Sequence, residues 1–194
     1  MRHEELAKGS ALQLRVEPSP HFAFLRDFLR SSGFNEESIC RQVGVKGLNE
    51  FLPEDRSRTT LSGESDGLGV LTRLFLFGEP LSSKVLESVI PGRALAAMKD
   101  LGLLIEDPAD KARMCASVAL YPVGWLFIVS DRWTTLDGSS PELSDDFVFP
   151  AINANTSQFM ATLPQEPCES FLELCSGTGA AALEAARRTP RLGS

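Results

Sequence analysis

The chain has 194 residues, of which 43% are hydrophobic and 23% are charged, a composition typical of a globular protein with a buried core. Its 26 acidic and 19 basic residues give a net charge of −7, which argues against strong nonspecific attraction to nucleic acid or to an anionic membrane. Two histidines, His3 and His21, and four cysteines without a C-x-x-C pair offer little material for a metal site or a His-based catalytic triad.

The N-terminal residues contain no apolar segment of the kind that directs export. The longest uncharged stretch, residues 114–130, is too short to cross a bilayer comfortably and is interrupted by Pro122 and Gly124. We therefore expect a cytoplasmic protein without a membrane span.

The first 60 residues are predicted to form a helical N-terminal region. Apolar residues recur at helical spacing over residues 20–30, and Asn35 is placed to cap a second helix that ends near Gly44. Residues 53–69 are rich in Ser, Thr, Gly and acidic side chains without an apolar period, which predicts an exposed loop and a domain boundary.

Residues 61–135 are predicted to form an accessory domain of three helices and a hairpin. Apolar stripes predict one helix that ends before Gly78, a short one that begins at Ser82 or Ser83, and a third over residues 91–101. A short strand over residues 103–106 and a hairpin over residues 114–129, with its turn at residues 121–125, follow.

This order resembles a winged helix-turn-helix, with residues 91–101 as the recognition helix and residues 114–129 as the wing. DNA binding by that fold requires basic side chains on both elements. Residues 84–113 hold five basic and five acidic residues, and the predicted wing is nearly uncharged. We therefore expect a structural, dimerising or substrate-presenting role rather than DNA binding.

The following segment leads to a small-residue loop. Residues 147–149 are predicted as a short strand, and Asn155 or Thr156 as the cap of a helix that ends at Leu163. Residues 171–188, FLELCSGTGAAALEAARR, then predict a strand, a tight loop and a helix. Gly177 and Gly179 allow backbone angles that a side chain would forbid and let a ligand approach bare backbone.

Three cofactor classes use such a loop. A phosphate-binding P-loop needs Lys and Ser or Thr after its last glycine, where this chain has alanines. A dinucleotide fingerprint, G-x-G-x-x-A, fits Gly177, Gly179 and Ala182 and stays open, as does a plain strand-to-helix turn. Glu173 favours a third class, because a carboxylate there would repel a pyrophosphate and attract a cationic cofactor.

The segment resembles motif I of class I S-adenosylmethionine-dependent methyltransferases, an acidic residue followed by G-x-G-x-G. Glu173 matches the acid, Gly177 and Gly179 match the second and third glycines, and Cys175 stands where the first glycine is usual. The preceding stretch is similar to the methyltransferase small domain group, which includes glutamine methyltransferases of release factors and ribosomal RNA methyltransferases. The resemblance implies an S-adenosylmethionine site at these positions: Glu173, Cys175, Ser176, Gly177, Thr178 and Gly179.

The expected fold is α+β: the helical region and the winged-helix-like domain, followed over residues 145–194 by the first strand, loop and helix of a Rossmann-like methyltransferase domain. The sequence ends at Ser194, 15 residues after Gly179, before the later motifs of that family. We therefore expect no catalytic residues here, and a polypeptide that is inactive alone and binds the cofactor weakly or not at all. The methyl acceptor (RNA, protein or small molecule) and homodimerisation stay open, as does the alternative of a non-catalytic winged-helix regulatory or interaction protein.

Overall fold

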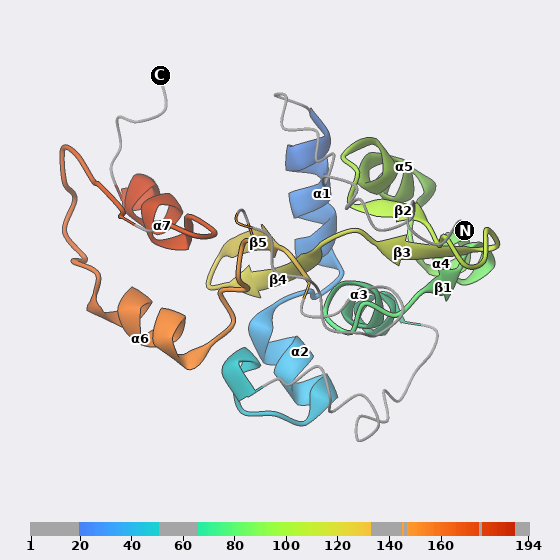
Figure 1. The fold of residues 1–194 in the computed structure, drawn as a ribbon, viewed down its shortest axis with the longest axis horizontal. Helices are drawn as coiled ribbons and strands as arrows, with labels where there is room; N and C mark the ends of the chain where they lie inside the picture. The colour runs from blue at the N-terminus through green and yellow to red at the C-terminus, as the bar shows by residue number, and fades with distance from the viewer. Residues whose placement is uncertain (1–19, 51–65, 133–144, 146, 175, 189–194) are drawn as a thin grey trace, which may run out of the picture.

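The structure is a computed structural model that describes residues 20–50, 66–132, 145, 147–174 and 176–188. These residues form seven α-helices, one 3-10 helix and two small antiparallel sheets, an α+β arrangement (Figure 1). Within these ranges, no helix combines the length and the apolar character that crossing a membrane requires.

The two predicted N-terminal helices are confirmed as α1 (Pro20–Ser31) and α2 (Glu36–Val43), and a 3-10 turn, η1 (Leu48–Glu50), follows them. The Asn35 side chain accepts a hydrogen bond from the backbone N–H three residues further on, at 3.0 Å, which satisfies a free donor at the start of α2. Gly44 ends the helix in the left-handed region with φ of 82°.

The predicted accessory domain contains three helices and a three-stranded antiparallel sheet with the spatial order β1-β3-β2. The three predicted helices and the strand near residue 105 are confirmed. The elements are, in chain order, α3 (Gly67–Phe75), β1 (Leu81–Ser82), α4 (Ser83–Val89), α5 (Gly92–Asp100), β2 (Leu104–Glu106) and β3 (Arg113–Ala116). Most of the loop predicted over residues 53–69 lies outside the described residues, and its last three residues belong to the first turn of α3.

The predicted hairpin is confirmed in its turn and its return strand, but the predicted span of residues 114–129 is too long. Its first part is β3, which pairs with β1 and β2, whereas the hairpin consists of β4 (Ala119–Val123) and β5 (Leu126–Ser130). Ser117 and Val118 lie between the two sheets, and the Ser117 side chain donates to the Gly102 carbonyl at 2.6 Å. The apolar pattern runs through both strands and so carries no information on which strand pairs with which.

The β4–β5 hairpin lies between two clusters of buried side chains. On one face, Leu120 belongs to the main core and Phe127 packs against it, together with side chains from α1 to α5. On the other face, Tyr121 and Ile128 form a second, smaller cluster with residues of the C-terminal region. This alternation follows from the two-residue period of a β-strand.

The C-terminal region places α6 (Ala154–Thr162) and α7 (Ala180–Arg188) beside the hairpin, on the side away from α3, α4 and α5 (Figure 1). The helix cap predicted at Asn155 or Thr156 is instead Asn153, whose side chain accepts from the Thr156 N–H at 2.8 Å. Both helices were predicted, and the difference in the cap lies within the usual uncertainty of a helix boundary.

The strands predicted over residues 147–149 and 171–174 are absent. The Val148 carbonyl accepts from the Asp131 N–H at 3.1 Å, and the Val148 N–H donates to the Asp131 carboxylate at 2.7 Å. No ladder continues from this pair among the described residues. Leu172 and Leu174 are 81% and 77% exposed, and no described strand pairs with them. An apolar run forms a strand only when a neighbouring strand pairs with its backbone N–H and C=O groups. The sequence of the run does not show whether such a neighbour exists.

Candidate functional site

The predicted small-residue loop is a tight turn at the start of α7. Gly177 and Gly179 have φ of 50° and 69°, in the left-handed region that favours glycine. The Gly179 N–H donates to the Ser176 carbonyl at 2.7 Å and closes the turn. A Cβ at either glycine would meet no atom within 4 Å, so the backbone angle rather than a lack of space requires glycine here.

Glu173 lies at the positive end of α7. Its Oε2 accepts a hydrogen bond from the Ala182 backbone N–H at 2.8 Å, so the carboxylate caps a donor in the first turn of the helix. The sequence predicts an acid beside the glycine loop, and in the structure this acid bonds to α7, nine residues further along the chain.

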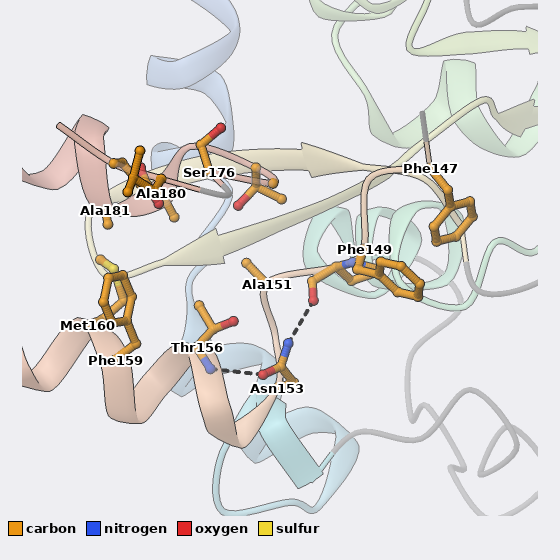
Figure 2. Close-up of a pocket in the computed structure, with 15 residues that line it drawn as sticks. Phe147, Phe149, Ala151, Asn153, Thr156, Phe159, Met160, Ser176, Ala180 and Ala181 are labelled. Carbon is orange, nitrogen blue, oxygen red and sulfur yellow. Dashed lines mark hydrogen bonds between the residues drawn. The ribbon is translucent and has the colours of Figure 1, made fainter. Parts of the chain in front are cut away.

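A cavity of about 320 Å³ separates the glycine loop from α6. Figure 2 shows Ser176, Ala180 and Ala181 on one side of it, and Thr156, Phe159 and Met160 of α6 on the other. Of the six predicted site residues, Glu173, Ser176, Gly177 and Thr178 line the cavity, Gly179 does not, and Cys175 lies outside the described residues. The remaining lining residues are Phe147, Phe149, Pro150, Ala151, Asn153 and Leu174.

Aromatic side chains form a part of the wall that the sequence did not reveal. The rings of Phe147 and Phe149 meet edge to face, with centroids 4.8 Å apart. Phe149 and Phe159 are about half exposed at the cavity. Sequence reasoning assigned residues 147–149 to a strand, and only the exposed rings identify them as a surface on which a flat ligand group can stack.

Asn153 shapes the wall between these aromatic residues and α6. Its side chain accepts from the Thr156 N–H and donates to the Pro150 carbonyl at 3.1 Å, the two bonds drawn in Figure 2. Both ends of the amide are therefore used to hold the backbone, which makes Asn153 a structural residue of the wall.

The β4–β5 hairpin supports the cavity from behind. The Tyr121 side chain is fully buried, and its oxygen accepts from the backbone N–H of Ala151 at 2.7 Å. Burial raises the pKa of Tyr121 despite opposing hydrogen bonds with Ser130 and Ala151, so the phenol stays protonated. Ala180 and Ala181 are also buried, which explains why small side chains begin α7.

A second cavity, of about 380 Å³, lies between α1, the end of α5 and the hairpin. Arg26 is the one charged residue among the described residues that line it, and the others are apolar. It lacks the combination of glycine loop, carboxylate and helix start found in the first cavity. Over the described ranges, no three His, Cys, Asp or Glu side chains gather in a way that could hold a metal ion.

Comparison with models of protein families and with curated protein sequences finds no match to this chain. Any statement about its activity therefore rests on the residues and geometry of the cavity.

Proposed function

We propose that this chain provides the accessory region and the opening part of the cofactor site of an S-adenosylmethionine-dependent methyltransferase. The observation that carries the proposal is the Glu173 carboxylate, which lines the cavity beside Gly177 and bonds to the first turn of α7.

The position of Glu173 favours a cationic cofactor over a dinucleotide. Dinucleotides place their pyrophosphate at the start of the helix that follows the glycine loop. Here a carboxylate already accepts from the Ala182 N–H, and a second anion at that place would meet its negative charge. A ligand with a positive charge would be attracted instead.

The rest of the cavity fits the other parts of S-adenosylmethionine. A volume of about 320 Å³ is within the usual range of about 300–1,000 Å³ for small-molecule sites. The exposed faces of Phe149 and Phe159 suit a flat heteroaromatic ring, and the left-handed glycines leave the loop backbone bare for close approach.

The cofactor, when bound, supplies a methyl group on a positively charged sulfur for in-line attack by an acceptor. The residues described here would hold it: the glycine loop by its backbone, Glu173 by its charge, and the aromatic wall by stacking. Such a reaction depends largely on the alignment of the two reactants. The described cavity residues include no candidate general base other than Glu173, which caps α7, so we assign no catalytic residue.

The test is a titration of the ¹⁵N-labelled chain, followed by NMR, with S-adenosylmethionine, its neutral-sulfur product S-adenosylhomocysteine, and NAD. We expect S-adenosylmethionine to shift the amide signals of Gly177 and Gly179, with weak affinity because Glu173 is the one charged residue among the described cavity residues. NAD should shift them less at equal concentration.

Glu173→Gln is the matched variant, because glutamine keeps an oxygen that can cap Ala182 and loses the negative charge. We expect it to weaken S-adenosylmethionine binding more than S-adenosylhomocysteine binding, because the second ligand keeps the ammonium group and lacks the charged sulfur. Loop signals that do not respond to S-adenosylmethionine, or that respond more strongly to NAD, would contradict the proposal.

The accessory region supports a winged-helix assignment, again as a proposal. Its elements follow the order helix, strand, two helices and two strands, with β3 between β1 and β2. In this arrangement the wing is the β2–β3 connection, residues 107–112, rather than the predicted residues 114–129. That connection carries two acidic residues and one lysine.

The surroundings of α5 argue against its use as a DNA recognition helix. Arg93 lies over the Phe24 ring of α1 at 4.3 Å, and Asp100 lies 3.6 Å from the His21 side chain of the same helix. α1 therefore engages Arg93 and Asp100, two of the three charged residues of α5, and leaves Lys99 exposed. A dimerising or substrate-presenting role fits this region better.

The second candidate function is a non-catalytic winged-helix regulatory or interaction protein, which the strand order β1-β3-β2 favours. A DNA-binding assay at several salt concentrations discriminates between the two. Affinity that falls steeply as salt rises would support the second candidate, because it reports phosphate neutralisation.

A further inference from the structure

The tip of the β4–β5 hairpin contacts the helix that follows the glycine loop. The Trp125 indole N–H donates to the Glu184 carboxylate of α7, two residues separated by 59 positions in the sequence. Glu184 is only 8% exposed, which is unusual for a carboxylate. A buried charge at such a place requires partners, and α7 supplies them.

The Glu184 carboxylate is held by two arginines. Its Oε1 accepts from Arg188 at 2.7 Å and from Arg187 at 3.2 Å. The Arg187 guanidinium also lies over the Trp125 ring, 5.2 Å from its centroid. We refer to Trp125, Glu184, Arg187 and Arg188 as the tryptophan clamp.

The clamp contacts two other parts of the chain. Arg188 donates to the Pro164 carbonyl at 2.6 Å, just after α6, and Arg30 of α1 approaches the Trp125 carbonyl at 3.4 Å. The clamp thus connects α1, the hairpin, α7 and the segment that follows α6.

We propose that Glu184 is a positioning residue, through which the hairpin of the accessory region fixes the glycine loop against the aromatic wall of the cavity. As a statement about cofactor binding, this rests on the proposed function. Glu184 lies one helical turn beyond Ala180 and Ala181, which line the cavity, and a helix moves as a rigid unit over that distance.

The hairpin holds the opposite wall in the same way. Tyr121 of β4 accepts from the Ala151 N–H at the cavity, while Trp125 at the end of the same hairpin holds α7. One hairpin therefore bonds to both walls of the cavity, so the accessory region contributes to the structure of the site.

The test compares Glu184→Ala, Glu184→Gln and a matched control, Glu37→Ala. Glu37 forms an exposed i,i+4 pair with Arg41 at 2.6 Å on α2, a helix that contributes no residue to the cavity lining, so its removal deletes a helical Glu–Arg pair outside the site. Amide hydrogen exchange without ligand reports the mobility of residues 176–183, and the S-adenosylmethionine titration reports the site.

For Glu184→Ala we expect exchange at Ala182 and Leu183 to rise about tenfold, with exchange in α3, α4 and α5 unchanged. Affinity for S-adenosylmethionine should fall at least about threefold. Glu184→Gln keeps an acceptor for the indole N–H and should lie between the wild type and Glu184→Ala, and Glu37→Ala should match the wild type.

Unchanged exchange at Ala182 and Leu183 in Glu184→Ala would overturn the proposal. If that variant does not fold, Trp125→Phe keeps an aromatic ring and removes the indole donor, and wild-type exchange in it would overturn the proposal equally. If the loop signals of the wild type do not respond to S-adenosylmethionine, the proposed function is contradicted. The exchange rates of Ala182 and Leu183 without ligand still test the positioning role of Glu184 in that case.

Discussion

A methyl group added at Gly78 would meet the Arg132 guanidinium, which bonds two parts of the fold. Gly78 follows α3 with φ of 60°, and its carbonyl accepts from Arg132 Nη2 at 2.9 Å. The other end of the guanidinium, Nη1, donates to the Ala116 carbonyl at 2.9 Å. Arg132 thereby connects the end of the hairpin to the three-stranded sheet.

In Gly78→Ala, the new Cβ would lie 1.8 Å from Arg132 Nη2 and 2.5 Å from Cζ, so the guanidinium has to leave. The left-handed backbone costs alanine about 1–2 kcal/mol. Loss of two charge-assisted hydrogen bonds adds about 2–3 kcal/mol once water replaces part of them. We expect the free energy of unfolding to fall by about 3–5 kcal/mol.

Gly124→Ala is the matched control, because Gly124 has φ of 59° and nothing within 4 Å of an added Cβ. It should show the backbone cost alone, about 1–2 kcal/mol. Urea unfolding followed by circular dichroism measures both variants. Equal losses in the two, or an undiminished Gly78→Ala loss in an Arg132→Ala background, would refute the role given to the guanidinium.

Three further predictions concern buried groups. Tyr121→Phe leaves the Ala151 N–H without its acceptor and should destabilise the protein by about 1–3 kcal/mol in the same unfolding assay, and a neutral result would contradict the bond. Burial raises the pKa of Glu184, but hydrogen bonds from Trp125, Arg188 and Arg187 outweigh it and lower the pKa below the ordinary 4.5. The stabilisation from Glu184 is therefore present above pH 4.5 and is lost as pH falls through the lowered pKa, so Glu184→Gln should flatten acid unfolding curves. Burial, with help from Asp107, raises the pKa of the Cys115 thiol to about 11, so at pH 8 a maleimide should label it only after unfolding. Rapid labelling of Cys115 in the folded chain, located by peptide mapping because Cys168 is partly exposed, would refute its burial.

Local features were predictable from the sequence because their causes lie within a few residues. Asn35 and Gly44 bound α2 through hydrogen bonds that span three or four positions, and the helical stripes of α3, α4 and α5 needed no knowledge of their partners. The left-handed turn at Gly177 and Gly179 is equally local. The glycine loop and the helix after it were therefore found correctly.

Pairing and burial were not predictable, since they depend on residues far apart in the chain. Residues 114–129 carry one apolar pattern, yet β3 joins one sheet and β4 another. Leu172 and Leu174 lie in an apolar run that predicts a strand, yet both side chains are exposed in the structure. In each case the backbone partner decides the outcome, and the pattern contains no information about it.

The sequence by itself therefore determined the helices, the glycine loop and the acid beside it, because helix propensity, capping and backbone angles act over short distances. Only the tertiary structure decided that Glu173 caps α7, that Phe147 and Phe149 line a cavity, and that Tyr121 and Trp125 bond to Ala151 and Glu184. These contacts join residues up to 59 positions apart, and only the folded chain brings them together.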